Sequence, residues 1–242
     1  VDSYNKLCVN KDARICMPKM RIDEDTDIVA YSREQVEKLD KYFSGTNAET
    51  AYLLGRCCGL RINECYGLKW ENVDIKHGTI TIDRQMQYQE GLIKLVSLKT
   101  RNARRTVYMS DKLKTYFLHL EQERKVQAAT QAAQRAQNQT FITDIDGKQI
   151  SSIELVNSLP NGKIQTVNSM KYHSRTIKSE LGINFKYHHL RHTYGTRLAE
   201  MNTPTHILCN QMGHASGKVT ERYYLAVSYT HLRAHETRRH LV

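Results

Sequence analysis

The stretch H-H-L-R-H-T, from His188 to Thr193, sets three imidazoles around one guanidinium near the C-terminal end of the chain. It is followed by M-G-H-A-S, from Met212 to Ser216, and then by two adjacent tyrosines, Tyr223 and Tyr224. Far upstream the chain reads G-L-R-I-N-E, from Gly59 to Glu64. Cations, imidazoles and a phenol therefore occur in a fixed order, and we expect the fold to gather them at one site.

These side chains together suit the chemistry of a phosphate group. Arg61, Arg191, His188 and His214 have the charge and the donors to clamp one phosphate while the phenol of Tyr223 attacks it. Guanidiniums fit this role because their planar forks bind phosphate oxygens bidentately and keep their charge. A phenol has an ordinary pKa of about 10, so it needs a base or cationic surroundings to attack at neutral pH.

The chain as a whole is basic. It has 242 residues, a formal net charge of +11 and a pI of about 9.3. Such a charge favours a polyanionic partner, because each Lys or Arg placed on a phosphate releases condensed counterions. A soluble basic protein without such a partner has the same composition, so the charge alone does not identify nucleic acid as the ligand.

Cysteine usage and hydropathy indicate a compartment. The six cysteines form no C-x-x-C pair, and the chain contains no apolar run of the length that a secretory signal or a bilayer span requires. We therefore expect a reducing, cytoplasmic setting with unpaired thiols. The cysteines are Cys8, Cys16, Cys57, Cys58, Cys65 and Cys209.

Hydrophobic spacing predicts a mainly α fold with a small antiparallel β-sheet. Between about residues 78 and 110 the apolar period changes to two, which is typical of strands. Apolar residues at helical spacing, with Ser32 as an N-cap and Gly59 as a stop, predict helices on both sides of that region. The expected helical segments are about 32–43, 46–58, 61–68, 111–137, 165–180, 189–201, 204–212 and 217–226.

The motifs resemble those of the catalytic domain of tyrosine recombinases, the phage and conjugative-transposon integrases, over roughly residues 30–226. The resemblance runs through G-L-R-I-N-E as the first arginine box, L-K-T-R-N-A-R-R-T-V as the β-hairpin lysine segment, H-H-L-R-H-T and M-G-H-A-S as the later boxes, and a tyrosine nine positions after His214. Each motif alone is weak, but their order is highly specific. The resemblance implies the fold of that catalytic domain.

The resemblance also implies an activity. It implies a site-specific DNA recombinase or integrase that cleaves and rejoins strands of double-stranded DNA through a 3′-phosphotyrosyl intermediate, without a metal or another cofactor. Protomers would act as a homotetramer on paired sites. We expect residues 1–27 to be the remnant of a linker, 28–226 the catalytic domain, and 227–242 a tail whose His- and Arg-rich sequence also looks like translated vector sequence. The family's core-binding and arm-binding domains would then be missing.

Roles follow from the resemblance, motif by motif. Arg61 and Arg191 would bind the non-bridging oxygens, and Tyr223 would be the nucleophile. His188 would take or share the tyrosine proton, and His214 would donate to a non-bridging oxygen. Lys99 would protonate the leaving 5′-oxygen. Glu64 and His192 are expected to orient these groups, and the DNA backbone would be contacted by the basic side chains Arg101, Arg104 and Arg105.

Other interpretations of the same residues remain open. Arg61 has the position of a solvated helix end, Tyr223 of an aromatic core residue, and Lys99 of one charge in a solvated run. Tyr224 and Tyr229 are alternative candidates for the nucleophile, at other spacings from His214.

Other functions remain open as well. His188 and His192, at i and i+4, have the spacing of two zinc ligands, although a third ligand with regular spacing is missing. A type IB topoisomerase, a telomere resolvase and a non-catalytic DNA-binding module are the competing functions.

Overall fold

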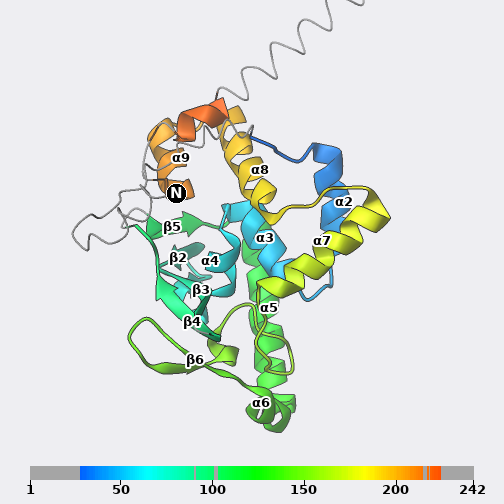
Figure 1. The fold of residues 1–242 in the computed structure, drawn as a ribbon, viewed down its shortest axis with the longest axis vertical. Coiled ribbons are helices and arrows are strands. Elements are labelled where there is room, and N and C mark those ends of the chain that lie inside the picture. The colour runs from blue at the N-terminus through cyan, green and yellow to red at the C-terminus, as the bar shows by residue number, and fades with distance from the viewer. Residues whose placement is uncertain (1–27, 90, 101–102, 215–216, 218, 225–242) are drawn as a thin grey trace, which may run out of the picture.

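A computed structural model describes residues 28–89, 91–100, 103–214, 217 and 219–224 (Figure 1). The linker expected at 1–27, the tail expected at 227–242, Arg101 and Tyr229 lie outside the described residues. The domain boundaries at 27 and 227 therefore stay predictions.

The start of the first helix and the end of the second are where the sequence predicts, whereas the second begins at Glu49 and the third ends at Tyr66, inside the expected segments 46–58 and 61–68. Helix α2 (Arg33–Phe43) starts at a capping box, in which the Ser32 hydroxyl accepts a bond from the Gln35 backbone N–H at 3.2 Å and the Gln35 side chain accepts one from Ser32 N–H at 3.0 Å. Helix α3 (Glu49–Cys58) ends at Gly59, whose φ of +63° is left-handed. Helix α4 (Ile62–Tyr66) follows at once, so Arg61 lies between two helix ends.

The other helices lie within a few residues of the predicted segments, except that the single helix expected over 111–137 is divided at Gln131 into two. They are α5 (Asp111–Thr130), α6 (Ala132–Asn138), α7 (Val167–Leu181), α8 (Tyr187–Glu200) and α9 (Thr205–Met212), with short 3₁₀ turns η1 (Trp70–Asn72) and η3 (Ser152–Glu154). Residues 217 and 219–224 are helical too. The mainly helical fold class is therefore confirmed. None of the described helices combines the length and the apolar character needed to cross a membrane.

The strands form two small sheets. One has the order β1 (Val73–Asp74), β2 (Thr79–Ile82), β5 (Arg105–Tyr108) and is antiparallel throughout. The other has the order β3 (Arg84–Gln89), β4 (Leu92–Ser97), β6 (Phe141–Thr143), β7 (Gln149–Ser151), in which β4 and β6 run parallel.

The position of Lys99 differs from the sequence prediction. Strands β4 and β5 belong to different sheets, so Lys99 lies in the segment that connects the sheets and not in the turn of a hairpin. The alternation of apolar residues along β4 and β5 is satisfied by either pairing, and the sequence therefore could not distinguish a hairpin from a crossing between sheets.

Close packing of α3 against α8 positions the candidate site. Figure 1 shows α3 near the centre of the molecule, with the strands on one side and α2 and α7 on the other. Gly55 of α3 allows the approach, because a Cβ there would lie 2.6 Å from the Tyr187 hydroxyl of α8. This contact brings α8, and with it Arg191, beside the end of α3. A second, smaller apolar cluster joins α8, α9 and the last helical segment through Ala199, Leu208, Met212 and Tyr223.

Candidate active site

One cleft of about 670 Å³ gathers the side chains that the sequence analysis singled out for phosphate chemistry. It lies where α4, the start of α8, the end of α9, the last helical segment and the β4–β5 connection meet. The predicted residues that line it are Arg61, Glu64, Lys99, His188, Arg191, His192, His214 and Tyr223.

Arg191 is a fully enclosed cation at the bottom of this arrangement, with 2% of its surface exposed. Its Nη1 donates to the Gly59 carbonyl at 2.6 Å, and its Nη2 donates to the Met212 carbonyl. Both acceptors lie at helix C-termini, where unpaired carbonyls carry partial negative charge. Burial, and then the charge of Arg61, lower the pKa of Arg191 to about 9, which leaves the guanidinium charged at neutral pH.

Arg61 is held in a different way, by Glu64. Glu64 accepts bonds from the Arg61 backbone N–H at 2.8 Å and from Nη1 at 2.9 Å. Burial raises the pKa of Glu64, but the hydrogen bond and charge of Arg105, together with the charges of Arg61 and Arg191, outweigh it and lower the pKa to about 2. The carboxylate is therefore ionised, and the Arg61 side chain, 39% exposed, is oriented and yet reachable from the cleft.

Tyr223 lines the cleft with its ring packed among histidines, and only 4% of its surface is exposed. Its ring is stacked with His214 at a centroid distance of 6.1 Å and meets His192 edge-on, also at 6.1 Å. Burial raises the pKa of Tyr223, and the charges of Arg191 and Arg61 oppose that rise. A phosphate that binds these arginines would thus lie beside the phenol that they help to ionise.

Tyr224 lies outside this cleft. Its hydroxyl donates to the Thr203 carbonyl, and its ring packs against the smaller apolar cluster. The geometry therefore favours Tyr223 over its neighbour as the nucleophile.

Burial favours the neutral form of the three imidazoles in the cleft. Burial and then Arg191 lower the pKa of His214 to about 3, and burial and then His188 lower that of His192 to about 4. The pKa of His188 is also lowered, by burial and by Arg191 and Arg61. A neutral imidazole can accept the proton of a phenol, and it can also donate its own N–H to an oxygen.

The histidines form contacts with one another and with the last helical segment. The rings of His188 and His192 meet edge to face, with 4.4 Å between centroids. His214 Nδ1 lies 3.0 Å from the Thr220 hydroxyl, a partner that orients its ring. Within the described part of the chain, no group of three or more His, Cys, Asp or Glu side chains is placed to hold a metal ion.

The basic residues of the β4–β5 connection do not behave alike. Lys99 is exposed and lines the cleft, and the Arg104 side chain is 69% exposed, with its Nη2 3.9 Å from Asp83. Arg105 corrects the sequence analysis, because its side chain is only 4% exposed and binds the Glu64 carboxylate. The structure therefore places the Arg105 guanidinium against Glu64 and away from the surface, a position that does not support the expected contact with the DNA backbone.

Three amide side chains of the cleft were missed from the sequence. Asn63, Gln85 and Gln87 line it beside the arginines, and Gln85 also donates to the Ser97 carbonyl at 3.3 Å. Two of them lie on β3, and only the arrangement of the sheets brings that strand to the cleft.

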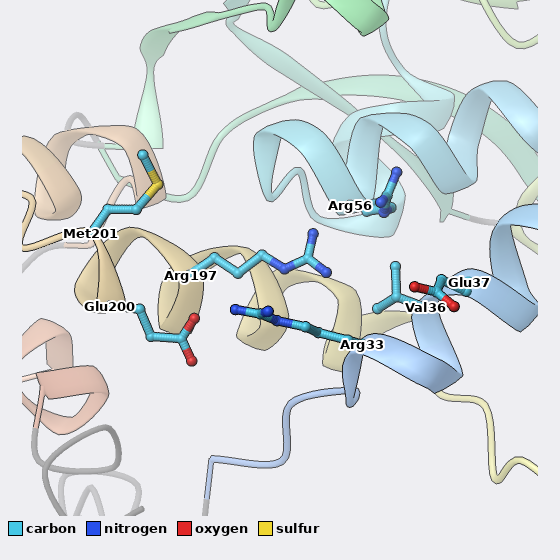
Figure 2. A pocket seen from close by; sticks show the side chains of 7 residues that line it. All are labelled: Arg33, Val36, Glu37, Arg56, Arg197, Glu200 and Met201. Carbon is cyan, nitrogen blue, oxygen red and sulfur yellow. The ribbon is translucent and has the colours of Figure 1, made fainter. Parts of the chain in front are cut away.

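A second cleft, of about 390 Å³, lies at the junction of α2, α3 and α8 (Figure 2). Its charged side chains are three arginines and two glutamates, all labelled in Figure 2, and the described residues of its lining include no tyrosine, histidine or lysine. It therefore lacks the side chains that the first cleft offers for attack on a phosphate. The lining residues are Arg33, Val36, Glu37, Arg56, Arg197, Glu200 and Met201.

Comparison with known proteins gives the affiliation of the chain. The model of the phage integrase family matches residues 30–231. The chain belongs to the phage integrase family. Its fold and motifs are those of a tyrosine recombinase catalytic domain.

The individual relatives share a quarter or less of their aligned residues with this chain. A XerC-like tyrosine recombinase of Caldanaerobacter subterraneus subsp. tengcongensis is 25% identical over 216 residues, which are 84% of this chain and 51% of that protein. The chain thus spans about half the length of that curated relative. The Tn1549 transposon integrase, in complex with circular intermediate DNA, shares the fold with a TM-score of 0.67 and 24% identity over 90% of this chain and 69% of that one. The XerA recombinase matches with a TM-score of 0.57 and 17% identity over 85% and 65%.

The backbone position of Gly195 in this integrase domain gives a prediction about Tyr223. A Cβ at Gly195 would lie 2.6 Å from a carbon of the Tyr223 ring, so Gly195→Ala has to displace the ring. We expect DNA cleavage to fall by at least about tenfold, because small misplacements of a reacting group cost that much, while DNA affinity is kept. Gly217→Ala is the control, because a Cβ there meets nothing within 4 Å. Equal rates for both variants would show that the ring has room to move.

Proposed function

We propose that this chain is the catalytic domain of a site-specific DNA recombinase or integrase, placed at residues 28–226, which cleaves one DNA strand at a time with Tyr223. The observation that carries this proposal is the convergence of two arginines, three histidines, an exposed lysine and Tyr223 on one cleft in a member of the phage integrase family. The part of the chain on either side of the domain is proposed to be a linker at 1–27 and a tail at 227–242.

Arg61 and Arg191 stabilise the phosphorus transition state. Attack by the tyrosine oxygen gives a pentacoordinate phosphorus with more negative charge on its non-bridging oxygens than the ground state carries. The two guanidiniums are fixed before the DNA binds, Arg191 by two carbonyls and Arg61 by Glu64. Donors that are already oriented cost no reorganisation at the moment of reaction, and they favour the transition state over bound DNA.

The remaining side chains move protons. His188, kept neutral by burial and nearby positive charge, accepts the proton of the Tyr223 phenol, while His214 donates to a non-bridging oxygen. Lys99 gives a proton to the 5′-oxygen as its bond to phosphorus breaks. The products are a 3′-phosphotyrosyl link and a free 5′-hydroxyl. A 5′-hydroxyl of the partner strand then attacks the link, so the phosphate ester energy is retained and no ATP is consumed.

Double-stranded DNA is the proposed partner. The net charge of +11 suits a polyanion, and the Tn1549 integrase, which has the same fold, was solved with DNA. We also propose that protomers assemble as a homotetramer on two paired sites, in the cytoplasm.

A suicide substrate tests the function. A duplex nicked close to the cleavage site loses the short 5′-hydroxyl strand by diffusion, so the covalent product accumulates and appears on a denaturing gel as a protein-linked strand. Two intact duplexes then separate the two enzyme classes, because a recombinase exchanges strands between the duplexes whereas a topoisomerase rejoins each strand within its own duplex. A duplex that is bound without any covalent adduct would contradict the proposal and favour a non-catalytic DNA-binding module.

The role of Lys99 has its own test. A general acid is dispensable when the leaving group is already a stable anion, so a substrate with sulfur at the 5′-bridging position should restore cleavage by Lys99→Ala. The same substrate should not rescue Arg191→Ala, because that variant lacks a transition-state donor. Failure of the sulfur substrate to rescue Lys99→Ala would leave Lys99 as a backbone contact.

A further inference from the structure

We infer that Arg105 is a positioning residue, which fixes the segments that carry Arg61, His214 and Lys99 relative to one another. This inference rests on the proposed function, because the three segments matter together only if the cleft is a phosphate-transfer site. Arg105 lies at the first position of β5. The sequence alone predicts a contact with the DNA backbone for Arg105, and not a positioning role.

The first connection runs from Arg105 to Arg61. Arg105 Nη1 and Nη2 donate to the two oxygens of Glu64 at 3.0 and 2.8 Å, a bidentate pair, and the Glu64 side chain is only 1% exposed. Glu64 also holds Arg61 through its backbone N–H and its Nη1. One carboxylate therefore joins a fully enclosed arginine to the arginine that faces the cleft.

The second connection runs to the segment that ends in His214. Arg105 Nε donates to the Gln211 carbonyl at 2.9 Å, in the last turn of α9. The helix ends two residues later at Gly213, with a left-handed φ of +59°, and His214 follows directly. The bond to Gln211 therefore holds the C-terminal end of α9 in place, and with it the backbone position from which the His214 side chain projects.

The third connection runs to the segment of Lys99. Arg105 Nη1 also donates to the Ala103 carbonyl at 3.0 Å, and Ala103 lines the cleft four residues after Lys99. All five donors of a guanidinium point in fixed directions within one plane, so a single side chain can hold three separate partners. A lysine at this position keeps the charge but offers one compact ammonium group in place of the fork.

The test compares cleavage, binding and stability for wild type, Arg105→Lys, Arg105→Met, Glu64→Gln and the double variants. Single-turnover cleavage of the nicked duplex is measured at saturating DNA. We expect Arg105→Lys to stay folded, to bind DNA within about threefold of wild type with an unchanged salt slope, and to cleave at least about tenfold more slowly. The neighbouring exposed Arg104→Ala is the comparison for a lost DNA-backbone contact, with a salt slope smaller by about one unit.

A double-mutant cycle separates positioning from a general loss of stability. If Arg105 acts through Glu64, the effects of Arg105→Lys and Glu64→Gln on the cleavage rate are strongly non-additive, while independent effects add. The pH profile of cleavage by Arg105→Met should gain an additional acidic limb, in which the rate rises as Glu64, deprived of its main partner, loses its proton at a higher pH than in wild type. If Arg105→Met does not fold, the cycle with Arg105→Lys decides.

Normal cleavage by Arg105→Lys, or a loss confined to DNA affinity and salt slope, overturns the inference while leaving the proposed function standing. Additive effects in the cycle also overturn it. No covalent adduct with the wild-type chain would instead contradict the proposed function itself.

Discussion

Replacement of Tyr223 by phenylalanine is expected to abolish the covalent adduct between the protein and the cleaved strand. The change removes only one oxygen, and the ring keeps its stacking against His214 and its edge contact with His192. DNA affinity should stay within about threefold, because the arginines and histidines of the cleft are untouched, whereas catalysis loses its nucleophile altogether. Denaturing electrophoresis with the nicked duplex measures the covalent adduct, and a binding titration at fixed salt measures the DNA affinity.

Tyr224→Phe is the matched control for that experiment. It removes the same atom one position along the chain, but the hydroxyl it removes binds the Thr203 carbonyl away from the cleft. We expect adduct formation at a rate close to wild type. The free energy of unfolding should fall by about 1 kcal/mol because one hydrogen bond is lost. An adduct that survives in Tyr223→Phe and disappears in Tyr224→Phe would place the nucleophile in the other register.

Local signals explain why most of the fold could be predicted. The cap at Ser32 and the stop at Gly59 depend on residues only a few positions away, so the start of α2 and the end of α3 follow from the sequence. The gathering of Arg61, Arg191 and His214 depends on contacts between distant segments, and no periodicity encodes those. There the order of the motifs, through the family resemblance, supplied the missing long-range information.

Long-range pairing explains what the sequence could not show. The run of basic residues after Lys99 has the same charge whether its members point outward or inward, yet Arg104 is exposed and Arg105 is enclosed beside Glu64. Successive side chains of an extended segment point to opposite sides, and packing of the start of β5 against α4 and α9 decides that Arg105 is the one that faces Glu64 and Gln211. The arrangement of the sheets brings Gln85 and Gln87 into the cleft.

The second large effect is expected for Arg191→Lys. The guanidinium of Arg191 binds the carbonyls that end α3 and α9 and at the same time lines the cleft. A lysine ammonium has neither the width nor the planar fork to reach both carbonyls, so at least one buried acceptor is left unpaired at a cost of about 1–3 kcal/mol. We expect a lower melting temperature, and cleavage has to be measured well below it.

Well below the melting temperature of the variant, the cleavage rate shows whether the charge of Arg191 is enough or whether the geometry of its guanidinium is needed. Arg191→Lys keeps a positive charge near the phosphate but loses two oriented donors, so we expect cleavage at saturating DNA to fall by at least about a hundredfold. DNA affinity should change far less, because bound DNA in its ground state gains little from donors directed at the transition state. Arg61→Lys should follow the same pattern without the loss of stability, since its side chain is partly exposed and a lysine can still pair with Glu64. Equal losses in affinity and rate for either variant would mean that the arginine holds the DNA and does not act on the transition state.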